Sequence, residues 1–168
     1  MRILWVLIFC FSLLKAGNID ISGIYKTHKG TDGGQSIVEI FKSGDTFYVY
    51  GLKNLEREPI KDSCNKNAHL RERLSVGNVF AYGYSDNGKG QLTGGQIYNF
   101  NNCKFYYSKI IPKSDGTIEF VGALDSYYIM HRGYIWEKLS ESEAAKYAPL
   151  RKPIDFLLKT ANDTKMSR

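Results

Sequence analysis

Short runs of apolar and aromatic residues, separated by turn clusters, make up the segment from Gly94 to Leu139. The clusters fall at residues 101–102, 113–116 and 125–126, and no helical pattern lies between the runs. This spacing predicts an antiparallel meander. Adjacent hairpins without a crossover helix must pack as two layers or curl closed, so the segment predicts half of a sandwich or barrel.

The same pattern continues upstream, and the chain as a whole predicts an all-β fold of eight antiparallel strands. Eight strands in up-and-down order can close into a barrel, which removes exposed edges and leaves room for one small ligand. The predicted strands cover residues 21–27, 36–42, 46–52, 77–84, 91–100, 104–111, 117–123 and 128–139.

Alternation along individual strands predicts which side chains face the interior. Glu39 and Lys42 cannot both lie inside, which selects Val38 and Ile40. Lys109 and Glu119 face outward, which turns their neighbours inward. The candidate lining of the interior is Tyr25, Val38, Ile40, Tyr82, Tyr106, Ser108, Phe120, Arg132, Tyr134 and Trp136. Each of these could also be ordinary core packing, because a small barrel can be filled by its own side chains.

Two segments depart from the strand pattern. Residues 53–74 are polar and lack a period, so they predict a long loop with a helical turn near Ala68 to Arg73, either a lid or a plain connection. Residues 140–168 predict a helical extension. Ser140 and Glu143 form a capping box, a second helix begins near Pro153, and the end from Asn162 to Arg168 is expected to fray.

The N-terminus has the form of a secretory signal peptide. A charged start precedes the apolar run from Ile3 to Leu14, which is too short to span a bilayer, and Ala16 offers a cleavage site. We therefore expect residues 1–16 to be removed, residues 17–139 to form the barrel, and the protein to be periplasmic or secreted. No stable membrane anchor is predicted in the mature chain.

Charge and cysteine content narrow the chemistry. Removing Arg2 and Lys15 with the signal peptide lowers the formal net charge from +6 to +4, a mild, dispersed basicity that does not favour nucleic-acid binding. Cys64 and Cys103 are then the remaining cysteines, and export favours a disulfide between them over two free thiols. The histidines show no metal-ligand spacing, and no cofactor motif is present.

Catalytic motifs are also lacking. There is no Gly-x-Ser-x-Gly elbow and no family-like cysteine and histidine pattern. His131, within reach of Asp125 in sequence, is the candidate general base if the protein is an enzyme. A single histidine is more often structural or exposed, so we do not expect an enzyme.

An ordered set of segments carries a family resemblance over residues 22–138. The segments are SGIYKT, SIVEIF, SGDTFYVYGL, a cysteine-bearing loop with LRERL, LTGGQIYNF, KFYYSKI, TIEFVGAL and RGYIWEKL. In this order they resemble a family of small exported bacterial proteins of uncharacterised function.

The resemblance implies a lipocalin-like, calycin-type barrel. Lipocalins begin with a Gly-x-Trp strand and pack an arginine of the last strand over that Trp. Gly23 and Tyr25 occupy the first pattern here, with Tyr in place of Trp, and Arg132 is the residue that would supply the second.

The resemblance also implies a function. We expect a carrier or scavenger that holds a small apolar or amphipathic molecule inside the barrel, with aromatic contact area and one arginine to orient it. Two alternatives stay open. One is an enzyme that uses His131, and the other is a module that contacts the envelope or a host surface, which an exposed aromatic patch would favour.

Overall fold

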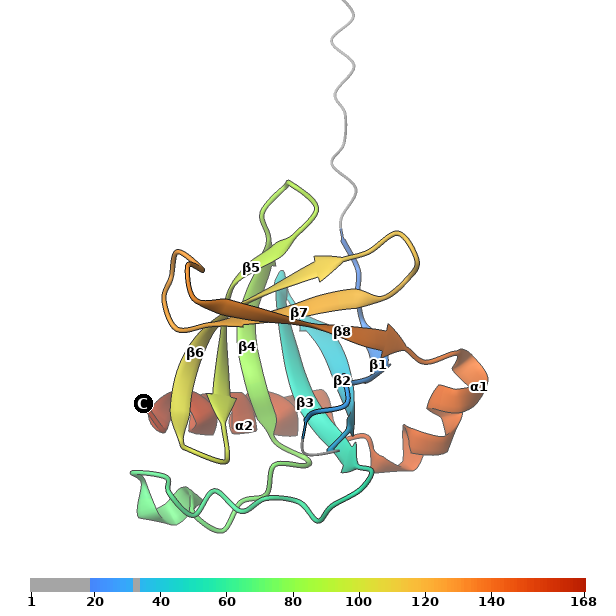
Figure 1. The fold of residues 1–168 in the computed structure, drawn as a ribbon. Helices are drawn as coiled ribbons and strands as arrows, with labels where there is room; N and C mark the ends of the chain where they lie inside the picture. Colours follow the sequence, from blue (N-terminus) through green and yellow to red (C-terminus); the bar gives the residue numbers. More distant parts are fainter. Residues whose placement is uncertain (1–18, 32–33) are drawn as a thin grey trace, which may run out of the picture.

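The computed structural model describes residues 19–31 and 34–168, and these form a closed barrel of eight antiparallel strands (Figure 1). Each strand pairs with the next one in the chain, and the last strand pairs with the first. The predicted fold is therefore confirmed. The strands are β1 (Gly23–Lys26), β2 (Ser36–Ser43), β3 (Thr46–Asn54), β4 (Val79–Asp86), β5 (Leu92–Asn99), β6 (Lys104–Pro112), β7 (Ile118–Ala123) and β8 (His131–Lys138).

The predicted signal peptide, residues 1–16, lies outside the described residues. Among the residues that are described, no helix is long and apolar enough to cross a membrane.

One end of the barrel interior is filled by side chains. Phe120 and Trp136 stack there with ring centroids 4.0 Å apart, and Tyr25 and Ile40 pack into the same cluster. The Tyr25 hydroxyl donates a hydrogen bond to the Ile21 carbonyl at 2.8 Å. Burial raises the pKa of Tyr25 to about 12, because the ionised phenolate would lose its hydration. This closed end is a packed core.

The C-terminal segment covers the outer wall of the barrel. The predicted capping box opens α1 (Glu141–Ala144), and η2 (Ala145–Leu150), a 3-10 helix, follows it. Helix α2 (Ile154–Met166) then lies against β4, with Leu157 buried in an outer apolar cluster (Figure 1).

The end of the chain is ordered, so the prediction of a frayed tail is wrong. Thr164 and Ser167 are 0% and 2% exposed. The Thr164 hydroxyl donates to the Val79 carbonyl at 2.6 Å, and Thr160 accepts a hydrogen bond from the Val79 amide at 3.1 Å. Helix α2 thus docks through hydroxyls at four-residue spacing. An apolar pattern does not report such contacts, because hydroxyls are usually taken as solvent-facing.

A buried ion pair anchors the long loop between β3 and β4, which contains the short 3-10 helix η1 (Ala68–Leu70). The Asp62 carboxylate accepts hydrogen bonds from Arg73 Nε at 2.6 Å, from the Tyr98 hydroxyl at 2.6 Å and from Asn65 Nδ2 at 2.7 Å. The Arg73 guanidinium also donates to Ser167 at 3.1 Å. Arg73 is therefore a scaffold residue, and it ties the loop to both the barrel and α2.

The predicted disulfide between Cys64 and Cys103 is confirmed, with Cα atoms 5.8 Å apart. It joins the β3–β4 loop to the turn that precedes β6. Together with the Asp62 and Arg73 pair, the disulfide fixes the loop at one end of the barrel.

Candidate functional site

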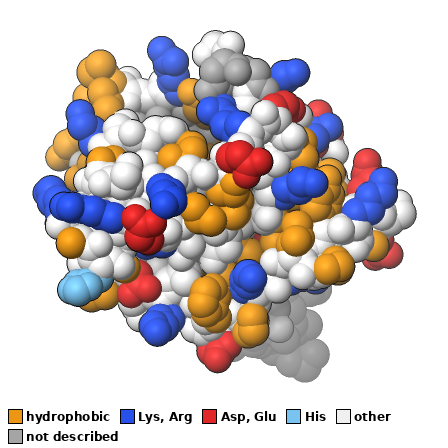
Figure 2. All heavy atoms as spheres, turned by 90° about the horizontal axis from the view of Figure 1, so that it is seen from below, with side chains coloured by type: hydrophobic (Ala, Val, Ile, Leu, Met, Phe, Trp, Pro, Cys, Tyr) orange, Lys and Arg blue, Asp and Glu red, His pale blue; other side chains and the backbone are white. Residues whose placement is uncertain are grey.

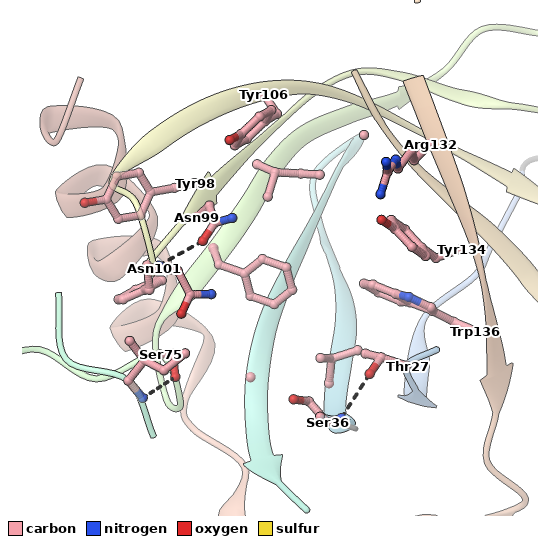
Figure 3. Close-up of a pocket in the computed structure, with 18 of the residues that line it drawn as sticks. Thr27, Ser36, Ser75, Tyr98, Asn99, Asn101, Tyr106, Arg132, Tyr134 and Trp136 are labelled. Atoms are coloured by element: carbon pink, nitrogen blue, oxygen red, sulfur yellow. Dashed lines mark hydrogen bonds between the residues drawn. The ribbon is translucent and has the colours of Figure 1, made fainter. Parts of the chain in front are cut away.

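A cavity of about 960 Å³ opens at one end of the barrel (Figure 3). In an up-and-down barrel alternate connections lie at the same end. The connections β1–β2, β3–β4, β5–β6 and β7–β8 therefore surround one mouth. A cavity of this size is at the upper end of the usual range for small-molecule sites.

Three residues of β8 form a column along the cavity wall. They alternate inward and lie one above another in the order Arg132, Tyr134, Trp136 (Figure 3), and Arg132 is the one next to the β7–β8 connection. At the rise of a β-strand, the column spans about 13 Å. Trp136 rests on Phe120 of the closed end, so the column connects a charged mouth to an aromatic floor.

Polar side chains around the mouth hold its loops in place. The Asn101 amide donates to Asn99 Oδ1 at 2.8 Å, and the Ser36 amide donates to Thr27 Oγ1 at 3.0 Å (Figure 3). Ser75 Oγ accepts a hydrogen bond from a backbone amide of the β3–β4 loop at 3.0 Å. The mouth is therefore polar and structured, whereas the deeper wall is apolar.

The charged residues that line the described cavity are basic. Arg57, His131 and Arg132 belong to the lining, and within residues 19–31 and 34–168 no aspartate or glutamate does. Around the mouth end of the molecule, acidic and basic side chains are intermixed with hydrophobic ones (Figure 2). The basic bias therefore belongs to the cavity and not to a broad surface field.

His131 lies at the rim, with Nδ1 2.6 Å from the Tyr128 carbonyl oxygen. Because a carbonyl only accepts, Nδ1 carries the hydrogen in the neutral ring and Nε2 is an acceptor. Asp125, the expected partner, instead accepts backbone hydrogen bonds from Tyr127, Ile129 and Met130. These hydrogen bonds lower the pKa of Asp125. The Asp125 carboxylate is thus bound to the loop backbone and does not orient His131 as a catalytic pair would require.

Five of the ten residues predicted to line the interior lie on the cavity wall. These are Val38, Tyr106, Arg132, Tyr134 and Trp136. Four others lie in the closed end below the cavity: Tyr25, Ile40, Ser108 and Phe120. Ser108 is fully buried and accepts a hydrogen bond from the Tyr84 hydroxyl at 2.8 Å, while its own hydroxyl donates to the Val121 carbonyl at 2.7 Å. These four side chains belong to the packed core and support the cavity from below.

The prediction that Tyr82 lines the interior is wrong. Tyr82 packs in the outer cluster beside α2, and its hydroxyl donates to Gln96 at 3.0 Å. The pairing of β3 with β4 shifts register between Val49 and Tyr50. Ala81 belongs to the interior cluster and Phe80 packs against it, so strict alternation fails across this bulge.

The expected packing of Arg132 over Tyr25 is also wrong. Arg132 pairs with Gly122 near the open end, whereas Tyr25 pairs with Lys138 at the other end of β8. The Lys138 ammonium lies 5.9 Å from the centre of the Tyr25 ring. Lys138 therefore supplies the cation at the closed end, and Arg132 lines the cavity.

Several residues of the mouth were missed by the sequence analysis. They are loop or strand-end residues with no alternation to read: Thr27, Asn54, Arg57, Ser75, Asn99 and Asn101. Only the strand order could have identified them, because an up-and-down barrel places these four connections at the same end.

Metal binding has no obvious centre in residues 19–31 and 34–168. No three His, Cys, Asp or Glu side chains there are grouped closely enough to hold a metal ion.

Comparisons with known proteins agree with this architecture. The protein HP1028 from the human pathogen Helicobacter pylori, described as belonging to the lipocalin family, is 33% identical, with a TM-score of 0.76. The alignment covers 84% of this chain and 98% of HP1028. No curated protein matches the chain. Residues 23–138, from the first strand to the end of the last, match the uncharacterised proteins conserved in bacteria that are grouped as DUF2147. The chain belongs to this DUF2147 family.

Proposed function

We propose that this protein is an exported carrier or scavenger that binds a small apolar or amphipathic molecule in the barrel cavity. The observation that carries the proposal is the cavity itself, about 960 Å³, with an aromatic floor and a polar mouth. Pockets of this kind bury most of a small ligand on apolar walls and orient it through a few polar groups. The likeness to a lipocalin supports the same function, because eight-stranded barrels of that kind can hold one ligand.

Native mass spectrometry of protein purified from its own host is the direct test. A stoichiometric small molecule, released by denaturing extraction, supports the proposal and gives the ligand's chemical class. A bare protein that also takes up none of a panel of amphipathic molecules would contradict it. The same spectrum tests export, because a mature chain that begins at Gly17 has the mass expected after removal of residues 1–16.

Trp136 offers an internal probe of occupancy. The chain has two tryptophans, Trp5 and Trp136. In the protein without its signal peptide, tryptophan fluorescence therefore comes from Trp136 on the cavity wall. We expect ligand binding to change the intensity and wavelength of this emission.

Filling the cavity provides a matched pair of variants. Gly122 lines the cavity, and a Cβ atom there would meet Ile97 Cδ1 at 3.5 Å, an ordinary contact. Gly122→Leu should therefore fold and weaken binding. Thr93→Leu adds the same side chain to β5 next to the inward-facing Leu92, so it faces outward and should bind as the parent does. If both variants bind the ligand equally well, the ligand does not bind inside the cavity and the proposal is contradicted.

A second candidate function rests on the β7–β8 loop. Leu124, Tyr127, Ile129 and Met130 are 62%, 84%, 79% and 64% exposed. Exposed apolar side chains gathered on one loop often mark an interaction site. Under this candidate, Tyr127→Ser, at the most exposed of these residues and outside the cavity lining, strongly reduces recovery of the protein with the cell envelope and leaves cavity binding intact. Unchanged recovery would contradict the candidate.

A further inference from the structure

We infer that the ligand is an anionic amphipath, with its carboxylate, phosphate or sulfate head on Arg132 and its apolar tail on Trp136. The inference rests on the proposed function and adds the ligand class and its orientation. It follows from the order of residues along the cavity and from the sign of the charges that line it.

The orientation comes from the column on β8. Arg132, Tyr134 and Trp136 follow one another along the strand (Figure 3); Arg132, next to the β7–β8 connection, is exposed, whereas Trp136 is 5% exposed and belongs to the buried apolar cluster. The floor is apolar, since Val38 belongs to the same buried cluster as Trp136 and Phe80 packs against that cluster. A charged head placed there would lose its hydration without a partner, at a large free-energy cost. The head must therefore lie at the mouth and the tail below it.

The charge sign comes from the lining. Among the residues of the lining that the structure describes, Arg57, His131 and Arg132 are the basic ones, and none is an aspartate or glutamate. A cationic head would meet repulsion there, and a neutral head would leave Arg132 unused. An anionic head gains charge-assisted hydrogen bonds from the guanidinium, whose planar fork matches carboxylate and phosphate oxygens.

Arg132 is available for this role. Among the described residues no carboxylate lies within salt-bridge distance of it, whereas Arg73 pairs with Asp62 and Arg151 pairs with Glu39. Asp125, in the adjoining loop, is engaged by backbone amides. The Arg132 guanidinium, which lines the cavity, is thus available to an anionic ligand.

The tail has a wall of suitable length. The column spans about 13 Å from Arg132 to Trp136, which suits an extended single chain of medium length. Below Trp136 the packed closed end stops further entry, with Phe120 stacked beneath the indole at 4.0 Å.

The test compares probes that share one tail and differ in the head. Binding of dodecanoate, dodecyl phosphate, dodecanol and dodecyltrimethylammonium to the protein is measured by calorimetry and by Trp136 emission, below the concentration at which each aggregates. We expect the two anions to bind at least 10-fold more tightly than the alcohol, and the cation to bind most weakly, because a charged hydrogen bond contributes roughly 10-fold or more in affinity. The ratio of dodecanoate to dodecyl phosphate identifies which anionic head is preferred.

Variants locate the effect. Arg132→Gln should weaken dodecanoate binding by roughly 10- to 100-fold and change dodecanol binding by less than about 2-fold. Lys89→Gln removes the same charge from the exposed β4–β5 turn at the opposite end and should change neither. Arg132→Lys keeps the charge but loses the planar fork, so it should recover only part of the anion preference.

The outcomes separate the two proposals. If no probe binds and native protein carries no ligand, the carrier function itself fails. If dodecanol binds as tightly as dodecanoate, or if Arg132→Gln weakens both equally, the cavity binds ligands but the anionic head is refuted.

Discussion

Removing the Arg73 side-chain charge should destabilise the protein more than any exposed charge change. The side chains of Arg73 and Asp62 are 9% and 0% exposed, and Arg73 Nε donates to the carboxylate at 2.6 Å. Removing one partner of a buried pair leaves the other charge uncompensated and costs about 3–5 kcal/mol. Arg73→Met is the preferred variant, because methionine keeps a long apolar side chain and removes only the guanidinium, whose Cζ lies 5.3 Å and 5.1 Å from the ring centres of Tyr98 and Phe100.

Equilibrium urea unfolding and thermal unfolding measure the effect. For a domain of this size, a loss of about 3–5 kcal/mol corresponds to a fall in Tm of roughly 6–20 °C. Lys61→Met is the control, since Lys61 and Glu72 form an exposed pair, 60% and 82% exposed, whose loss should cost no more than about 1 kcal/mol.

A double variant tests the reasoning itself. Asp62→Asn combined with Arg73→Met removes both charges, so its loss of stability should be smaller than the sum of the two single losses. Two results would contradict this reasoning. One is an Arg73→Met variant that loses no more stability than the Lys61→Met control. The other is a double variant whose loss equals the sum of the Asp62→Asn and Arg73→Met losses.

Three further predictions concern the same scaffold. Replacing Cys64 and Cys103 together by Ala opens a loop whose ends are 39 residues apart, and loop-closure entropy predicts a loss of about 4 kcal/mol; reductant should destabilise the parent equally and the variant not at all. Burial raises the pKa of Tyr25 and of Tyr98 from 10.0 to about 12; since both folded values lie above the unfolded value, their contribution is complete below pH 10 and is lost as the pH rises toward 12. Thermal unfolding across that range checks this, and a Tm that stays constant would contradict it. Thr164→Val removes a 2.6 Å hydrogen bond to β4, and it should cost about 1–3 kcal/mol in urea unfolding; a neutral result would mean that the end of α2 is not docked in solution.

The strand order could be predicted from the apolar runs and turn clusters, and the facing of β2, β6 and β7 from a charged residue that must lie outside. Glu119 faces outward and Phe120 inward, and Arg132, Tyr134 and Trp136 share the inner face of the neighbouring strand, β8, by simple alternation. Local period therefore determines side-chain direction wherever the pairing is regular.

Prediction failed where the outer wall is also apolar. On β4, Tyr82 is covered by α2 and Ala81 faces the interior, so neither face is polar and alternation cannot decide between them. A bulge in the pairing with β3 shifts the pattern further. The helix that buries this outer face lies more than 70 residues later in the chain, and only the folded structure shows which strand it covers.

The burial of Asp62 could likewise not be predicted from the sequence, because the hydrogen-bond network around it joins three separate segments of the chain. Arg73 lies in the same loop, but Tyr98 lies on β5 and Ser167, which contacts Arg73, lies beyond α2. A polar loop sequence is typical of a solvated connection, and nothing local distinguishes a carboxylate that will be enclosed.

The position of each polar group along the barrel separates folding from binding. In the closed end, the Tyr84 hydroxyl donates to Ser108 and the Ser108 hydroxyl donates to the Val121 carbonyl, so the polar groups of that half of the interior are satisfied without a ligand. At the open end, Arg132 meets no carboxylate among the described residues and faces the cavity. A barrel that is complete at one end can hold an unpaired cation at the other, because the filled core, the outer helix and the anchored loop already supply the stability. Under our proposal, this cation selects the ligand by its charge.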